Sequence, residues 1–269
     1  MSEPNKKNVN IAFGIVLFSL LFAIIAGAGF GSILQALFSD FNTTNITLLS
    51  LLVSTLMIGL PVIIYLRYNN LSHIKRLRFN RISLKITLST VIISVGLIII
   101  IDELDRIVYI LFGSPDFLGE LANQLQITSF KNGFLIILTT VIVAPIIEEM
   151  VFRGYLQKAL EDSWGDITKA ILVTSLFFAL VHLNLYWIVQ IYILGMLLGY
   201  LSWRTNSILP GIILHGLNNG FAVALNNVEN VFSRYYNWHE HVNPLWMLIA
   251  IILIIFGFKM LNKDLEILS

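Results

Sequence analysis

Long apolar runs separated by short polar segments dominate the pattern of this 269-residue chain. About 20 apolar residues in a row are enough for a helix to cross the hydrocarbon core of a bilayer. The runs therefore predict eight membrane-spanning helices, at residues 11–38, 46–66, 84–101, 133–152, 168–183, 186–203, 208–226 and 245–262. We expect an all-α membrane protein, built as a bundle of about eight transmembrane helices.

The composition agrees with this class, since 57% of the residues are hydrophobic and only 12% are charged. A typical soluble domain carries about twice that charge. The chain has no cysteine, which excludes disulfides, thiol catalysis and thiolate metal sites. We expect the lipid bilayer to surround the protein, and we expect no nucleic-acid partner.

The distribution of lysine and arginine predicts the orientation, because basic residues gather in cytoplasmic loops. With the N-terminus inside, the basic loop at 67–85 is also inside, together with the turns near 158–169 and 204. We therefore expect a multi-pass protein of the cell membrane with both termini cytoplasmic. We interpret the basic loop as a topology signal, and binding of anionic lipid is the alternative.

A charged stretch, DELDRIVYILFG, follows the third apolar run at residues 102–113. One interpretation places its charges inside the cavity of the bundle. We expect instead an amphipathic helix that lies at the outer membrane interface.

The fourth apolar run contains three charged residues, in the stretch PIIEEMVFRGYL. Glu149 and Arg153 are four positions apart, so on a helix they share a face and can form an ion pair. Glu148 points about 100° away from that face, and Pro145 permits a local kink. Ionisable residues inside a membrane mark functional sites by default, although a purely structural ion pair remains the alternative.

Two later runs each contain a polar pair with helical spacing. The stretch FFALVH places Phe178 and His182 four positions apart, and HGLNN does the same for His215 and Asn219. A single histidine on an apolar helix is often only a packed, hydrogen-bonded residue. The rise along antiparallel helices, however, brings these groups to a depth similar to that of Glu148. We therefore expect all of them to converge on one cavity.

Two pairs of glycines also have helical spacing, Gly195 with Gly199 and Gly216 with Gly220. Small residues four positions apart let membrane helices approach closely. We expect these glycines to pack the sixth and seventh helices against each other.

The stretches EEMVFRG, FALVH and HGLNN resemble the EExxxR, FxxxH and HxxxN motifs of the CAAX-protease and bacteriocin-processing (CPBP, or Abi) family of intramembrane endopeptidases. The resemblance covers residues 130–226, which we interpret as a catalytic core. We expect N-terminal helices with the basic loop and the interfacial helix at 1–129, and an outer loop with the last helix at 227–269.

The resemblance implies a role for each motif residue. Glu148 is implied as the carboxylate that activates water, with His182 as its partner. His215 and Asn219 are implied to stabilise the oxyanion. The residues implied to orient the site are Glu149, Arg153 and Phe178.

The resemblance therefore implies an intramembrane endopeptidase whose partner is a peptide or membrane-protein substrate. Members of the family cleave prenylated CAAX proteins or are linked to bacteriocin immunity and peptide maturation, and the sequence leaves the substrate, the cleavage site and the oligomeric state open. A non-catalytic membrane immunity or regulatory partner protein is the alternative. A transporter that uses the two glutamates as a proton relay is less favoured, because the chain lacks the internal repeats of many such folds.

Peptide hydrolysis at such a site can proceed with or without a metal ion. A zinc ion would need three protein ligands and an open position, most simply Glu148, His182 and His215. The chain lacks the HExxH arrangement, which supplies two ligands from one helical turn, and Asn219 suits an oxyanion hole better than a zinc site. We expect no cofactor and no metal, with a divalent metal such as zinc as the alternative.

Overall fold

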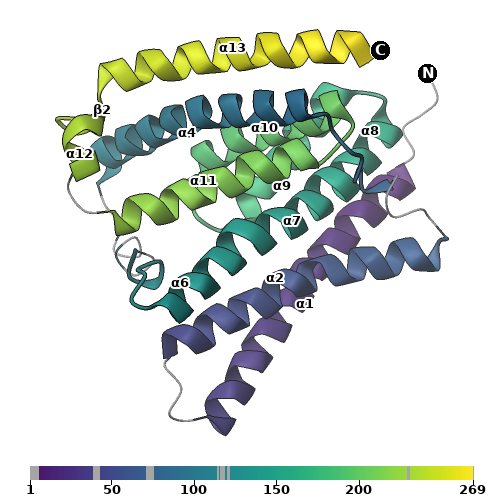
Figure 1. Cartoon of the computed structure of the whole chain (residues 1–269). Helices are drawn as coiled ribbons and strands as arrows, with labels where there is room; N and C mark the ends of the chain where they lie inside the picture. Colours follow the sequence, from purple (N-terminus) through teal and green to yellow (C-terminus); the bar gives the residue numbers. More distant parts are fainter. Residues whose placement is uncertain are drawn as a thin grey trace.

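A computed structural model describes residues 6–38, 43–70, 76–113, 115, 119, 122–228 and 231–268. These residues form a bundle of helices that lie side by side, and a short antiparallel hairpin pairs Asn237 with Val242 and Trp238 with His241 (Figure 1).

The elements follow one another along the chain with these bounds: α1 (Lys6–Leu37), α2 (Thr43–Tyr68), α4 (Leu84–Phe112), α6 (Phe130–Ile136), the π-helix η1 (Ile137–Val143), α7 (Ala144–Glu149), the π-helix η2 (Met150–Gln157), α8 (Lys158–Trp164), α9 (Ile167–Val181), α10 (Ile188–Thr205), α11 (Leu209–Asn227), α12 (Val231–Tyr236), β1 (Asn237–Trp238), β2 (His241–Val242) and α13 (Pro244–Leu268).

Within the described ranges, five stretches are long and apolar enough to cross a membrane: Asn8–Leu37, Thr43–Tyr68, Leu84–Phe112, Phe130–Trp164 and Pro244–Glu266. The helices α9 and α10 are apolar but shorter, and α11 carries several asparagines and a histidine. The predicted all-α membrane class is confirmed. The predicted count of eight membrane-spanning helices is not confirmed. By length and composition, the three helices α9, α10 and α11 are too short or too polar to be counted as membrane-spanning.

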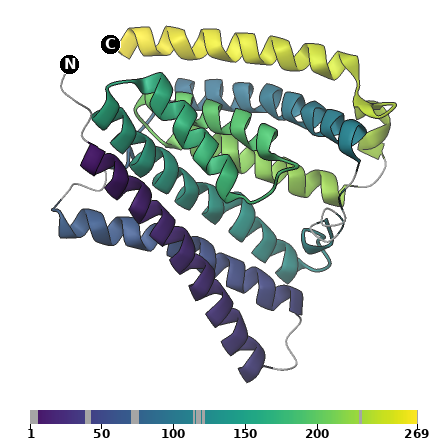
Figure 2. The ribbon, with the colours of Figure 1, turned by 180° about the vertical axis from the view of Figure 1, so that it is seen from behind.

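The bundle consists of two outer pairs of helices and a central group between them. In both views α13 lies along one side next to α4, and α1 with α2 lies along the opposite side (Figures 1 and 2). Between them run η2 and the helices α9, α10 and α11. Helix α1 begins, and α13 ends, at the end of the bundle that also holds the α8–α9 and α10–α11 turns. The start of α1 and the end of α13 thus lie on the same side of the bundle, and that this side is cytoplasmic stays a prediction.

Short polar signals set the ends of the central helices. The Ser129 and Asp166 side chains cap α6 and α9 by accepting hydrogen bonds from the backbone N–H groups of Asn132 and Lys169, a common way of satisfying the free N–H groups of a first turn. Gly165 ends α8 with a φ of +64°, a left-handed conformation that glycine adopts without steric cost. These signals fold α9 back against η2.

The helix that carries Glu148 is not a regular α-helix. The backbone N–H of Ala144 bonds to the carbonyl of Thr139, five residues back, and η1 and η2 flank α7 with π-helical turns. Such turns are rare and occur often at functional sites. The irregularity that the structure shows is these π-helical turns on either side of α7, and the kink that Pro145 permits stays a prediction. All eight residues of η2 are buried, so this segment lies in the centre of the core.

Helix α4 corrects the prediction for residues 102–113. The helix runs without a break to Phe112, so the charged stretch continues the membrane helix and does not form a separate interfacial one. Its charges are held by polar partners at the end of the bundle. Arg106 donates to the Asn237 side chain at 2.9 Å, and Glu103 accepts from the backbone N–H of Val242 at 2.7 Å.

The basic loop also contributes a side chain to the packing of the bundle. Arg78 is only 3% exposed, and its guanidinium donates to the carboxylate of Glu161 on α8. A side chain that is buried and paired in this way is part of the packing, which the sequence pattern of a basic loop does not reveal.

Candidate functional site

The centre of the site is a buried ion pair between Glu149 and Arg153. Arg153 Nη1 lies 3.0 Å from Glu149 Oε1, and both side chains have no exposed surface. The pair predicted from the spacing of four residues is confirmed. Burying a charged pair is costly where its polar atoms lack partners, and here Glu149 Oε2 and Arg153 Nε are buried without a hydrogen-bond partner.

His215 lies between the two glutamates. Its Nδ1 is 3.0 Å from Glu149 Oε1, and its Nε2 is 3.8 Å from Glu148 Oε2. The carboxylate of Glu149, which is paired with Arg153, can only accept a hydrogen bond, so the Nδ1 atom of His215 is the donor. The opposite nitrogen then faces Glu148, whose side chain is 20% exposed. The structure thus joins Glu148, Glu149, Arg153 and His215 in one cluster.

Gly211 makes room for this cluster from the first turns of α11. A Cβ atom added at Gly211 would lie 2.9 Å from Glu149 Oε2, closer than real Cβ contacts allow. The glycine therefore lets the backbone of α11 approach the buried carboxylate, and the sequence motifs contain no signal for it.

Phe178 is the aromatic partner of three site residues. Its ring lies 4.1 Å from the Arg153 guanidinium carbon, and its centre lies 4.7 Å from the His182 ring and 5.9 Å from the His215 ring. A guanidinium over an aromatic face is attracted by the ring quadrupole, more strongly when both are buried. Phe178 is 1% exposed and contacts both the buried cluster and His182.

His182 lies at the open side of the site, just after the last residue of α9. The side chain is exposed, and Nδ1 is 2.6 Å from the carbonyl oxygen of Phe178. That carbonyl can only accept, so Nδ1 donates and Nε2 is left as an acceptor. The next residue, Leu183, has a φ of +52°, a strained conformation that clusters at functional sites.

Asn219 lies one helical turn beyond His215 on α11. Its Nδ2 donates to the carbonyl of Thr140 at 3.0 Å. The π-helical bond of Ala144 goes to Thr139, and Pro145 has no N–H group, so no helical donor remains for Thr140. Pro145 thus frees a carbonyl that fixes the Asn219 amide, while the second amide hydrogen stays available.

The four glycines contact different elements from those predicted. A Cβ at Gly195 would lie 3.1 Å from Ser175 Cβ on α9 and 3.3 Å from Arg153 Nη2, and one at Gly199 would lie 2.7 Å from Gln157 Oε1. On α11, a Cβ at Gly216 would lie 2.9 Å from the carbonyl of Val141 in η1, and one at Gly220 would be 3.5 Å from the Val141 side chain. The expectation that these glycines pack α10 against α11 is therefore wrong, since the first pair faces η2 and α9 and the second pair faces η1.

The zinc alternative finds no support in the described residues. Among the described residues, no three His, Asp or Glu side chains are grouped so that they could hold one metal ion. The two ring nitrogens of His215 face different glutamates, and the Phe178 ring contacts both the His182 and the His215 ring. This arrangement gives no support to a common coordination sphere of Glu148, His182 and His215, and the expectation of no metal stays a prediction.

An apolar cavity of about 640 Å³ lies elsewhere, between α1 and α2, and its lining includes Phe18, Leu60 and Ile64. None of the candidate site residues lines it. The polar cluster, and not this cavity, is the feature with chemical capacity.

A comparison of the chain with protein families gives a match to the segment that contains the candidate site. Residues 130–221 match the family model of the type II CAAX prenyl endopeptidase Rce1-like proteins. The match confirms the resemblance to the CAAX-protease and bacteriocin-processing family, and it spans all seven residues that the motifs singled out. At the level of the family it supports a CAAX-type membrane protease.

No curated protein matches the chain significantly, and neither does any solved structure. The specific roles of the site residues therefore depend on the geometry described above.

Proposed function

We propose that the chain is an intramembrane endopeptidase that hydrolyses a peptide bond of a peptide or membrane-associated protein. The observation that carries the proposal is the position of His215 between Glu148 and Glu149. Two carboxylates, a histidine and an arginine in one largely buried cluster supply both a proton acceptor and hydrogen-bond donors, which peptide hydrolysis requires.

Glu148 acts as the general base in this proposal. Glu149 is paired with Arg153 and serves to orient His215, whereas the Glu148 side chain is 20% exposed, with Oε2 buried beside His215, and can bind a water molecule. His182 is the partner of Glu148 at the open side of the site. Its Nδ1 is bonded to the Phe178 carbonyl, so Nε2 is the ring nitrogen that remains for this role. The proton taken from water passes to the leaving amine.

His215 and Asn219 stabilise the oxyanion that forms when water attacks the carbonyl. His215 is held by Glu149 through Nδ1 and lies beside Glu148, where the reacting carbonyl group would bind. Asn219 has one amide hydrogen fixed on Thr140 and a second one to donate. Fixed donors of this kind cost no reorganisation when charge develops. The chain's own residues complete the reaction without a metal ion.

The protein acts from the cell membrane with both termini cytoplasmic, and its biological role is bacteriocin immunity or peptide maturation. This orientation is supported by the fact that the start of α1, the end of α13, the basic loop and the α8–α9 turn all lie on one side of the bundle (Figures 1 and 2). Basic segments favour the cytoplasmic face.

Membrane vesicles that contain wild-type protein or Glu148→Gln test the proposal. New peptide ends are quantified by mass spectrometry, both in the vesicle proteins and in two added peptides that end in a CAAX box, one farnesylated and one unmodified. We expect cleavage by wild type and a loss of about 100- to 10,000-fold in Glu148→Gln. Glu240→Gln, which alters an exposed glutamate in the hairpin turn, is the matched control and retains activity.

Ends that appear equally with wild type and Glu148→Gln would contradict the proposal. So would the absence of any end that depends on the wild-type protein, which would favour a non-catalytic partner protein.

A further inference from the structure

A second polar side chain holds η2 against α10 one turn beyond Arg153. Gln157 is fully buried, and its Nε2 donates to the carbonyl of Gly199 at 3.0 Å. Arg153 makes the equivalent bond to the carbonyl of Gly195 at 3.2 Å. The two donors are four residues apart on η2, and the two acceptors are four residues apart on α10. These bonds form two matching rungs between the helices, of which the sequence motifs include only one.

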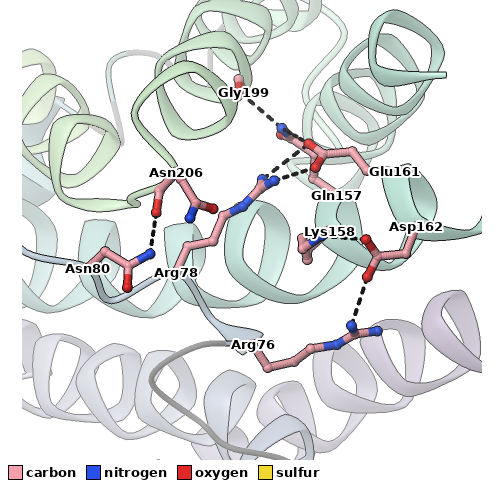
Figure 3. A network of polar contacts seen from close by, with 9 residues as sticks. All are labelled: Arg76, Arg78, Asn80, Gln157, Lys158, Glu161, Asp162, Gly199 and Asn206. Atoms are coloured by element: carbon pink, nitrogen blue, oxygen red, sulfur yellow. Dashed lines mark hydrogen bonds and ion pairs between the residues drawn. The ribbon is translucent and has the colours of Figure 1, made fainter. Parts of the chain in front are cut away.

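The second rung continues into a network at the end of the bundle. Gln157 Nε2 also donates to Glu161 Oε1 at 2.9 Å, and Glu161 accepts from the guanidinium of Arg78 (Figure 3). Arg78 has a φ of +56°, and its carbonyl accepts from the backbone N–H of Ile208 at 3.0 Å. Ile208 directly precedes α11, the helix that carries His215 and Asn219. The network therefore joins the two halves of the candidate site at their base.

The π-helical turns of η2 keep these polar residues in one row. In a regular α-helix each step of four residues turns by about 40°, so Glu149 and Glu161 would point about 120° apart. A π-helical turn takes more residues and so turns less at each one. Residues 149, 153, 157 and 161 can then all stay buried, as observed. The rotation of η2, and with it the direction of Glu149, depends on what holds this conformation.

We propose that Gln157, through its bonds to Gly199 and to the Glu161–Arg78 pair, is a positioning residue that sets the rotation of η2 and so directs Glu149 toward His215. The inference rests on the proposed proteolytic function and adds residues that act on the site without touching the substrate.

The test compares Gln157→Met with wild type in proteoliposomes, using whichever CAAX-box peptide the wild type cleaves. Methionine has a similar size and no strong hydrogen-bonding group, and Glu161 keeps its ion pair with Arg78. We expect kcat to fall about 10- to 100-fold, the size typical for partners that orient site ligands, while KM changes by less than about twofold. A change in overall stability would not separate kcat from KM in this way.

Gly199→Ala is the second variant, because its Cβ would lie 2.7 Å from Gln157 Oε1 and would displace that side chain. We expect the same loss of kcat, and the double variant should be no worse than the more affected single one, since both remove one interaction. Gln190→Met is the matched control. Gln190 is also buried on α10 but donates to Asp105 at the other end of the bundle, so its replacement should leave kcat unchanged.

A wild-type kcat in Gln157→Met, or losses that simply add in the double variant, would overturn the inference and leave the proposed function standing. If the wild-type protein cleaves no substrate, the proposed function fails and the inference fails with it.

Discussion

Two ion pairs in this protein have the same spacing and the same length but different surroundings. Arg153 with Glu149 and Arg106 with Asp102 are both four residues apart on a helix, and both bring nitrogen and oxygen to 3.0 Å. The first pair has no exposed side-chain surface, whereas the side chains of the second are 21% and 15% exposed. The sequence shows the same pattern at both places, and only burial separates them.

The difference in burial changes what each pair can do. Water and neighbouring polar groups can replace a partner at the partly exposed pair, so the pair contributes little on its own. At the buried pair no water replaces a lost partner, and the remaining charge is left in a medium of low dielectric constant. A cluster of this kind is maintained for its chemistry or its specificity more than for stability.

The largest expected effect is on stability when one arginine is removed. Arg153→Ala leaves Glu149 buried with only His215 beside it and should lower the free energy of unfolding by about 3–5 kcal/mol. Arg106→Ala should cost about 0–1 kcal/mol. Thermal unfolding of both variants in the same detergent measures the difference. Equal losses would mean that Glu149 is hydrated and that the two pairs do not differ.

The next largest effect is a loss of catalytic rate with no loss of stability. Asn219→Ala removes one oxyanion donor and should lower kcat by about 100- to 1,000-fold with little change in KM. Asn237→Ala, which removes a partner of Arg106, should leave kcat unchanged. Steady-state kinetics on one cleaved peptide compare the two, and a loss that appears in KM alone would place Asn219 in substrate binding.

A smaller effect tests the close packing around the buried carboxylate. Gly211→Ala puts a Cβ atom 2.9 Å from Glu149 Oε2 and should cost about 1–3 kcal/mol, the usual range for overpacking. Gly29→Ala is the control, because nothing lies within 4 Å of the added atom. If the melting temperatures of the two variants are the same, the carboxylate does not pack against α11 as described.

The smallest effect is the one expected from metal removal. Because no group of three His, Asp or Glu side chains that could hold a metal ion is found among the described residues, we expect exhaustive chelation to leave the rate of peptide cleavage unchanged. Elemental analysis of the purified protein should also find no stoichiometric zinc. If activity were lost on chelation and restored by zinc, the expectation would be wrong, and His182 and His215 would be zinc ligands.

Much of this picture could be predicted from the sequence because it depends on local spacing. The apolar runs located the helices, and four-residue steps predicted the Glu149–Arg153 pair and the shared faces of α9 and α11. Motif order then linked these helices to one family.

What could not be predicted depends on how helices rotate against each other. Nothing in the spacing says that His215 meets Glu149, or that Gly195 and Gly199 face η2. The π-helical turns change the rotation of the whole helix, and only the proline hints at them. Arg78 belongs to a basic loop whose composition suggests exposure, so its burial becomes visible only once Glu161 lies beside it.

The most direct test of the account compares one glutamate from each cluster. Glu148→Gln and Glu103→Gln make the same chemical change, the first beside His215 and the second beside His241 in the half-exposed cluster. With both proteins purified and equally folded, Glu148→Gln should cleave the peptide about 100- to 10,000-fold more slowly than wild type, and Glu103→Gln should cleave it at the wild-type rate. Equal rates for the two variants would contradict the assignment of the buried cluster as the active site.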